Sequence, residues 1–524
     1  MKLKVSLFGI LMFSILVIST YAQQDDFPFL KGPYLGQKPP GLEPQLFLPG
    51  LISTHYVDHC IAFLDEGRVC VFAIWERGTS YMYEKGGRWT RPQNAPWQNE
   101  QGTTDFTAGP DDRTIFFQSS RPTSKNDEKQ ETNIWTVEWT GKDWTEPVLL
   151  PEPANRKDYS EIYPSAAPDG TLYFFSRLRP GSRPGDMGDV FFTRFIEKGG
   201  YLEAERLENP INSYYYEVDP CVAPDGGYLL FGSGRPGGYS QLDLYICFRR
   251  DDGTWTHTVN AGPTLNPFCI PTRMSITPDG KYFFFPSRQP TAVPKGEAVE
   301  FYNVERWGDY DVYWISTDLF KDLREQYVNK MPAADEIRKA YRNTGLSQAQ
   351  ALLSELHSRK KSDYYFEPSE LLVFCGEMIA KNQFHQADRL YESLLSVFPG
   401  DWRILFGYSI ACIMNGRTGY GLELMKESWS RIPDSKSEEL FIVTFQLRIK
   451  SQKDAELEVL KFVTDEFPGS HYAFYNLADA YRHYGERDHA IEACQKALVL
   501  KPDFDEAAAL LKKLERDKAD EKKE

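Results

Sequence analysis

The chain lacks the short motifs that most directly indicate chemistry. It contains no Cys-x-x-Cys pair, no His-Glu-x-x-His motif and no glycine-rich phosphate loop after a strand, so zinc and nucleotide signatures are both missing. The segment Gly407–Ala411 lacks the second glycine of a nucleophile elbow and falls on an expected helix. We therefore expect no bound cofactor, and keep a divalent metal ion as the alternative.

Long apolar runs are missing after residue 22. Before it, Lys2 and Lys4 precede the apolar stretch Val5–Ile18, and Ser19–Ala22 ends in a small residue. This is the layout of a secretory signal peptide cleaved after Ala22, and the stretch is short for a membrane span. We expect an exported protein that is either periplasmic or secreted, with association with the outer membrane as a further alternative. After cleavage of the signal peptide we expect no membrane-spanning segment. A retained N-terminal anchor is the alternative.

Positive charge is outnumbered, since 75 Asp and Glu residues against 60 Lys and Arg residues give a formal net charge of −15. An acidic surface argues against nucleic acid and anionic lipid as partners. The eight cysteines are scattered, and only Cys60 and Cys70 flank one expected hairpin. They could form a disulfide in an exported protein, but buried thiols are an equal alternative.

What the sequence has in abundance is repetition. Pro-Asp-Gly turns precede strands rich in aromatic residues, and the five copies of this turn are separated by 45 to 58 residues. Proline fixes φ, aspartate caps the turn and glycine accepts a positive φ. That period leaves room for about four strands per copy, which is one blade of a β-propeller. The turns begin at Asp65, Pro110, Pro168, Pro224 and Pro278.

A second repeated element places an arginine after each strand and an aspartate at the start of the next. We predict that they pair within a blade, as a structural feature. The predicted pairs are Arg235 with Asp243, Arg177 with Asp189, and Arg288 with Asp311.

The string Ser233–Gly238, followed by Asp243-Leu244-Tyr245, resembles the WD40-like propeller repeats of TolB-type periplasmic proteins. The resemblance covers about residues 33–317 and implies the fold but not the function. The segment Gly41–Pro49 is similar to an outermost blade strand, and the fifth repeat ends without one. The N-terminal strand is thus expected to complete the last blade, which favours five blades over the alternative of six.

After residue 317 the pattern becomes helical. Prolines recur every 34 or 35 residues at Pro399, Pro433, Pro468 and Pro502, and the segment Phe474–Tyr481 with its following small residues resembles a tetratricopeptide repeat. The fold class we predict is multidomain, an all-β propeller followed by an all-α solenoid. The predicted parts are a signal peptide (1–22), propeller (33–317), helical connector (318–366), repeats (367–513) and charged tail (514–524).

Acidic residues recur where the innermost strands are expected to begin, near one mouth of the channel. They could bind a metal ion, a sugar or a basic peptide, and paired carboxylates are what glycoside hydrolysis requires. Their repetition in several blades favours a structural role, since a catalytic set is asymmetric. The candidate binding residues are Asp58, His59, Asp105, Glu161, Glu217 and Asp219, with His55 nearby.

Two binding architectures without a complete catalytic motif lead to one interpretation. We expect a non-catalytic binding or scaffold protein of the cell envelope, with a protein or peptide partner in the groove of the repeats and a glycan at the propeller. A glycosidase-like or metal-dependent enzyme at the acidic mouth is the alternative.

Overall fold

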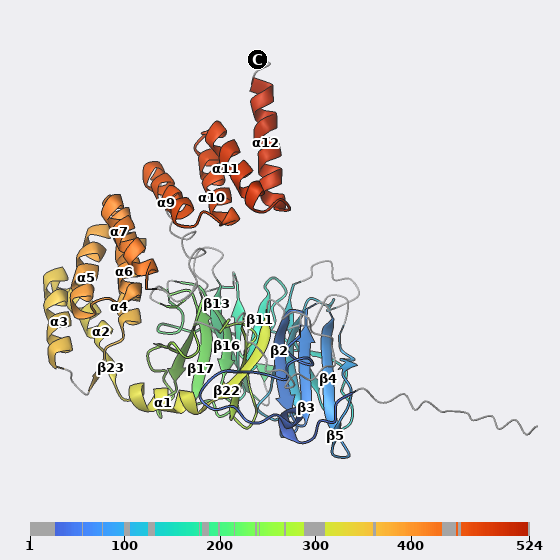
Figure 1. Cartoon of the computed structure of the whole chain (residues 1–524). Helices are drawn as coiled ribbons and strands as arrows, with labels where there is room; N and C mark the ends of the chain where they lie inside the picture. The colour runs from blue at the N-terminus through green and yellow to red at the C-terminus, as the bar shows by residue number, and fades with distance from the viewer. Residues whose placement is uncertain are drawn as a thin grey trace, which may run out of the picture.

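The computed structural model describes residues 27–54, 56–75, 77–98, 105–123, 131–177, 179–180, 188–196, 200–213, 215–235, 238–239, 242–266, 269–287, 310–359, 363–431, 447–448 and 452–521. Five radial sheets form a ring, and helices follow from α1 to α12 (Figure 1). The predicted fold class is confirmed, and the blade number is five, not six.

Each blade is an antiparallel sheet whose first strand lies at the central channel. Blade one contains β2 (Asp58–Leu64), β3 (Val69–Ile74), β4 (Gly78–Lys85), β5 (Arg88–Trp89) and β6 (Gln93–Asn94). Blade two contains β7 (Phe106–Ala108), β8 (Thr114–Ser119), β9 (Asn133–Glu138) and β10 (Val148–Leu149). Blade three contains β11 (Glu161–Ala166), β12 (Thr171–Ser176), β13 (Asp189–Ile196), β14 (Gly200–Tyr201) and β15 (Glu205–Arg206). Blade four contains β16 (Glu217–Val222), β17 (Tyr228–Ser233), β18 (Asp243–Phe248) and β19 (Val259–Asn260). Blade five contains β20 (Ser275–Ile276), β21 (Tyr282–Ser287) and β22 (Asp311–Ser316).

The N-terminal strand closes the ring. Strand β1 (Gln45–Leu46) pairs with β22, with Gln45 opposite Trp314 and Leu46 opposite Tyr313. The Ser53 hydroxyl donates to the carbonyl oxygen of Val312 over 3.1 Å. Phe47 is fully buried within the same core cluster as Trp314. The predicted closure is therefore confirmed, because β1 supplies the outermost strand of the last blade and covers the edge of β22.

The repeated turns adopt the conformation expected from their residues. Gly170, Gly226 and Gly280 have φ values of 80°, 71° and 72°, and glycine adopts this region without a Cβ penalty. The Asp169 carboxylate accepts a hydrogen bond from the Thr171 amide at 3.0 Å. These turns lie at the end of the ring opposite the mouth, where the mouth is the side on which the innermost strands begin.

The predicted arginine–aspartate pairs are wrong where the structure describes both residues. Arg235 lies 3.5 Å from Glu217, not on Asp243. Asp189 pairs with Arg206 at 3.0 Å instead of Arg177. Sequence spacing alone does not determine which acid an arginine reaches. The long Arg235 side chain extends from the end of the second strand to Glu217, at the start of the innermost strand. Arg288 lies outside the described residues.

All eight cysteines are buried free thiols, so the disulfide alternative is excluded. Cys60 lies opposite Ala73, and Cys70 lies opposite Phe63. Their side chains enter different core clusters, on the two faces of blade one. Burial raises the pKa of both thiols well above its usual value, which makes them unreactive packing residues.

Consecutive helices of the described array pack on one another. Trp429 of α7 stacks on Phe462 of α9 with ring centroids 5.3 Å apart, so these two helices are in direct contact. Within the array, α12 extends to Glu521, past the predicted end of the repeats at 513. The helices are α1 (Asp318–Tyr327), α2 (Ala333–Thr344), α3 (Leu346–Arg359), α4 (Pro368–Ala380), α5 (Phe384–Val397), α6 (Trp402–Met414), α7 (Thr418–Trp429), α9 (Lys453–Glu466), α10 (His471–His483), α11 (Arg487–Leu500) and α12 (Asp505–Glu521); the short strands β23 (Met331–Pro332) and β24 (Tyr364–Tyr365) pair between them.

A buried joint fixes the helices to the ring at blades four and five. Phe320 of α1 is 1% exposed, and its ring lies 5.3 Å from that of Tyr228 and 5.4 Å from that of Phe283. Further along, the Thr258 hydroxyl donates to Glu370 of α4 over 3.1 Å. Apolar burial and a satisfied buried polar contact both resist hinge motion, so ring and first helices form one body.

Candidate functional site

Three of the predicted mouth acids are caps that hold their own blades. Asp58 accepts hydrogen bonds from the amide and the hydroxyl of Thr54. Glu217 accepts from the Ser213 amide at 2.9 Å and from the Ser233 hydroxyl at 3.0 Å. Each carboxylate begins an innermost strand and fixes the loop that enters it.

Glu161 caps blade three in the same position, with a buried ion pair added. Its carboxylate lies 2.8 Å from Arg179, and the side chains are 0% and 1% exposed. The Arg156 amide donates to it over 3.2 Å. Burial raises the pKa of Glu161, and the Arg179 guanidinium opposes that rise. The Glu161 carboxylate is therefore already bound by groups of its own blade.

The remaining two acids converge on an arginine that the sequence did not single out. Arg273 donates from Nε to Asp105 over 2.5 Å, and its backbone amide donates to Asp219 over 2.8 Å. Gln118 donates to the other oxygen of Asp105 over 2.5 Å and accepts from the Tyr163 amide at 2.9 Å. We call Asp105, Tyr163, Asp219 and Arg273, one from each of four blades, the channel belt.

Three of the belt residues have an unusual backbone conformation, and two of these, Tyr163 and Asp219, lie in β-bulges. Tyr163, Asp219 and Arg273 all have φ near 55°, a left-handed conformation that is uncommon for residues other than glycine. The strand register shifts at the bulge between Ile162 and Ser165, and again at the equivalent place in blade four. A bulge re-aims a side chain, and it is frequent beside functional sites.

Electrostatics in the belt are dominated by burial. Burial raises the pKa of Asp105 and raises the pKa of Asp219 well above its usual value, and Arg273 opposes both shifts. Burial alone would lower the pKa of Arg273, but Asp105 and its neighbours raise it above the usual value. The belt therefore combines an Asp105–Arg273 ion pair with a buried Asp219 carboxyl whose pKa is raised.

His59 occupies the bulge of blade one beside this belt. It is 2% exposed, and among the residues that the structure describes neither ring nitrogen has a hydrogen-bond partner. Its ring meets the Trp75 ring edge-on, with centroids 5.6 Å apart, and the indole of Trp75 is 59% exposed. Burial and then the charge of Arg273 lower the pKa of His59 to about 3, so the imidazole is neutral at physiological pH.

The arrangement bears on the two chemical alternatives for the acids. Metal binding and glycoside hydrolysis both need carboxylates that are free to meet a ligand, whereas Asp105 and Asp219 are engaged by Arg273. Within the described ranges, no three His, Cys, Asp or Glu side chains are grouped as metal ligands. His55 lies outside the described residues.

Sequence reasoning missed Tyr163, Arg273 and Trp75. A positional signal was available for the first two, because the belt residue lies five positions before the proline of its turn in each of four blades: Asp105 before Pro110, Tyr163 before Pro168, Asp219 before Pro224, and Arg273 before Pro278. Trp75 had no such signal, since only blade one has an aromatic residue directly after its second strand.

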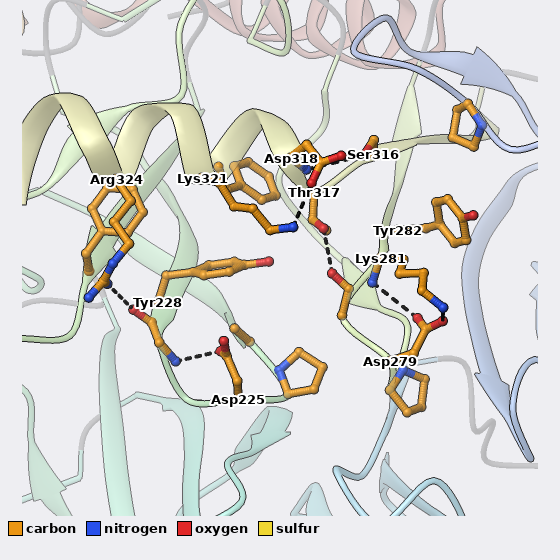
Figure 2. A pocket seen from close by; sticks show the side chains of 18 of the residues that line it. Asp225, Tyr228, Asp279, Lys281, Tyr282, Ser316, Thr317, Asp318, Lys321 and Arg324 are labelled. Atoms are coloured by element: carbon orange, nitrogen blue, oxygen red, sulfur yellow. Dashed lines mark hydrogen bonds and ion pairs between the residues drawn. The ribbon is translucent and has the colours of Figure 1, made fainter.

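A separate groove of about 890 Å³ lies on the opposite side of the ring, between α1 and the turns of blades four and five (Figure 2). Its charges are satisfied locally: Lys321 lies 2.7 Å from Asp318, and Lys281 lies 2.8 Å from Asp279. The Tyr228 ring forms part of its wall. We interpret this groove as the space left where α1 packs against the turns of blades four and five.

The last repeat exposes an aromatic and charged stripe on α10. Tyr472, Tyr475, Asp479 and Arg482 recur at helical spacing on one side of the helix, and Tyr472 is 48% exposed. The Phe504 ring lies 5.0 Å from that of Tyr472 and 5.3 Å from that of Tyr475. We call Tyr472, Tyr475, Asp479 and Arg482 the α10 stripe.

Comparison with known proteins agrees with this part of the chain. A family model of the tetratricopeptide repeat matches residues 471–504. The chain is a five-bladed β-propeller with C-terminal tetratricopeptide repeats. A search of curated proteins finds no match.

Solved structures give matches to the helical part. A crystal structure of MamA protein is 23% identical, with 28% of this chain and 79% of that chain covered and a TM-score of 0.19. YrrB, described as a TPR protein with an unusual peptide-binding site, is 19% identical, with 37% and 97% covered and a TM-score of 0.21. MamA from Desulfovibrio magneticus RS-1 is 19% identical, with 33% and 88% covered and a TM-score of 0.19. At these TM-scores the matches carry no argument about function.

Proposed function

We propose that this chain is a binding and scaffold protein of the cell envelope, in which the tetratricopeptide array binds a protein partner and the propeller mouth presents a second, glycan-binding surface. The observation that carries the proposal is the α10 stripe, an exposed aromatic and charged surface on the repeat that matches the family model. Stacked repeats of this kind form extended surfaces suited to protein segments.

The stripe has the composition of a recognition surface. Tyrosine offers a large apolar face with a polar tip, and arginine is enriched at protein interfaces. Asp479 lies 2.6 Å from Arg482 and 2.6 Å from Arg448 of the preceding repeat, so the charged end is held in place before a partner arrives. A preordered surface binds at a lower entropic cost.

The buried joint supports a scaffold role. Arg338 of α2 donates to the Glu370 carbonyl oxygen over 3.0 Å, and Thr258 of blade four contacts the Glu370 carboxylate. A partner held by the array would therefore sit at a defined position relative to the ring. Figure 1 shows α9–α12 on the side of the ring opposite α1, which is the side of the mouth.

A photo-crosslinking experiment tests the protein-binding proposal. We would place a benzophenone amino acid at Tyr472 and, as the matched control, at Val499 of α11, which is 81% exposed. The same envelope protein should be captured from the first position, and its capture should fall at least tenfold when Tyr475 and Arg482 are changed to alanine. Equal capture from Tyr472 and Val499 would refute a specific array surface.

The export proposal rests on the N-terminal pattern of residues 1–22. No helix within the described part of the chain is long and apolar enough to cross a bilayer. Expression in a Gram-negative host, followed by fractionation and N-terminal sequencing, should give a periplasmic protein that begins at Gln23. A full-length protein in the cytoplasm would refute export.

A further inference from the structure

A pocket lies at the joint between the ring and the first helices, away from the mouth. Its volume is about 410 Å³, which is within the range of small-molecule sites, and such sites are frequent at domain interfaces. Helix α2 supplies most of the wall, and α4 and the loop between blades three and four complete it. The lining residues are Asn209, Asp335, Arg338, Lys339, Arg342, Asn343 and Glu377.

Both walls of this pocket are held by internal contacts. On the ring side, Arg235 donates to the carbonyl oxygen of Pro210, directly after Asn209, over 2.6 Å. On the helical side, Arg338 is 11% exposed and donates to the Glu370 carbonyl oxygen over 3.0 Å. A ligand would therefore meet walls that already have their shape, which lowers the entropic cost of binding.

Two cations of the pocket are left without an internal partner. Arg338 pairs with Asp335 at 3.3 Å, whereas neither Lys339 nor Arg342 forms an ion pair with any residue that the structure describes. Both are exposed and lie three positions apart on α2, a spacing at which side chains are neighbours. Their two positive charges face one negative charge, that of Glu377. The pocket is thus net positive, in a chain whose formal net charge is −15.

These groups define the chemistry of a ligand that fits. The Arg342 guanidinium and the Lys339 ammonium bind the oxygens of carboxylate or phosphate groups. The amides of Asn209 and Asn343 can donate to the same oxygens, whereas the Glu377 carboxylate only accepts. A complementary ligand therefore carries an anionic group and, beside it, a hydroxyl or ammonium donor.

We propose that this pocket binds a small organic oxyanion, a carboxylate or phosphate with hydroxyl or ammonium donors beside the anionic group. The anionic group lies between Lys339 and Arg342, and a donor of the ligand binds Glu377. Because ring and helices both line the pocket, the bound ligand ties the loop between blades three and four to α2 and α4. This site goes beyond the proposed function and is independent of both the α10 stripe and the mouth.

Calorimetric titration of the full mature chain at constant ionic strength tests the proposal. Glucuronate, glycerol 3-phosphate and glutamate are the donor-bearing probes, and they distinguish a sugar acid, a phosphate ester and an amino acid as the source of the oxyanion. Sulfate is the oxyanion without a donor, and glucose is the neutral probe. We expect at least one donor-bearing probe to bind at least tenfold more tightly than sulfate and glucose, and to raise the melting temperature, since it binds the folded chain.

Matched variants locate the binding. The double variant Lys339→Gln with Arg342→Gln should weaken that probe at least tenfold. The control is Lys513→Gln with Arg516→Gln, two exposed cations with the same order and spacing on α12 that lie outside the pocket, and it should leave binding unchanged. Glu377→Ala should weaken the donor-bearing probe about fivefold without weakening sulfate.

The proposal is overturned if none of the three donor-bearing probes binds, or if sulfate or glucose binds as tightly. It is also overturned if the α12 control weakens binding as much as the pocket variant does, or if Glu377→Ala leaves the affinity unchanged. Lys339 and Arg342 are exposed, so their substitution should not change the melting temperature of the free chain. Photo-crosslinking at Tyr472 does not depend on any of these outcomes, so this site and the proposed function can fail separately.

Discussion

The ring and the array are both built from repeats, but they are stabilised over different distances along the chain. In the ring, Arg273 contacts Asp105 across 168 residues, and Ser53 contacts Val312 across 259. In the array, Arg417 meets Asp388 across 29 residues. A closed ring is therefore expected to unfold as a whole, while a stack of repeats loses units from its end.

Deleting the closing strand should have the largest effect. Removal of residues 27–50 takes away β1 and the buried Phe47, so blade five loses its outer strand and the ring gains an open edge. We expect the propeller to lose its cooperative unfolding transition. Urea denaturation monitored by far-UV circular dichroism measures this.

Truncation after residue 470 is the matched comparison at the other end of the chain. It removes α10–α12, whose main contacts among the described elements are with one another and with α9. The propeller transition should keep its midpoint. A shifted midpoint would show that ring and array unfold together, against the contrast drawn above.

Breaking a buried ion pair of the ring should have the next largest effect. Arg179→Met leaves the fully buried Glu161 without its partner, which should lower the free energy of unfolding by about 3–5 kcal/mol. The double variant with Glu161→Gln should regain most of that loss. In the array, Arg482→Met removes a pair in which Arg482 is 40% exposed, and should cost less than about 1 kcal/mol. Urea denaturation measures all three, and equal losses in ring and array would contradict the comparison.

Asp311 gives the ring a pH dependence. It is 2% exposed with Oδ1 unpartnered among the described residues, and burial raises its pKa to about 7. Because the folded pKa exceeds the unfolded one, protonation favours the fold. This contribution to stability is complete below pH 4 and is lost as pH rises to about 7.

Asp311→Asn should therefore stabilise the propeller by about 1–3 kcal/mol at pH 8 and have little effect at pH 4. The matched control is Asp189→Asn in blade three, whose carboxylate has Arg206 at 3.0 Å, and it should destabilise at pH 8. Thermal melts at the two pH values measure both variants, and a pH-independent effect of Asp311→Asn would refute the assignment.

Two glycines in α7 give the smallest effect. Gly421 stands where a tetratricopeptide repeat usually has alanine, and a Cβ there would lie 2.7 Å from the Ser409 carbonyl oxygen and 2.6 Å from Ile413. Gly421→Ala should therefore destabilise by about 1 kcal/mol, despite the higher helix propensity of alanine.

Gly419 has open space around its Cβ position, so Gly419→Ala should stabilise the array by about 0.5 kcal/mol. Chemical denaturation of the pair measures the difference. If both substitutions stabilise the array, close packing between α6 and α7 is not the reason that position 421 is glycine.

The sequence predicted what depends on local chemistry. Pro-Asp-Gly turns and the spacing of Pro468 and Pro502 act within a few tens of residues, and each gave the right element. The closing strand pairs with residues far along the chain, and it was predicted because Gly41–Pro49 is similar to an outermost blade strand. The structural interpretation of the mouth acids also followed from their repetition, and Asp58, Glu161 and Glu217 do cap their blades.

Partners across the ring could not be predicted in the same way. Arg235 was assigned to Asp243 because the two are near in sequence, yet it reaches Glu217 on the innermost strand. The contact between Arg273 and Asp105 requires that blades five and two face one another across the channel. The spacing of residues within one repeat does not show which residues of two different blades meet across the channel.

A double-mutant cycle between Asp105 and Arg273 tests the central claim most directly. We would measure the unfolding free energies of Asp105→Asn, Arg273→Met and the double variant. The account predicts that the two residues are coupled by at least about 1 kcal/mol, because each neutralises the other in the buried channel. Additive effects within about 0.3 kcal/mol would show that Arg273 does not hold Asp105, and that this carboxylate is free to bind a ligand.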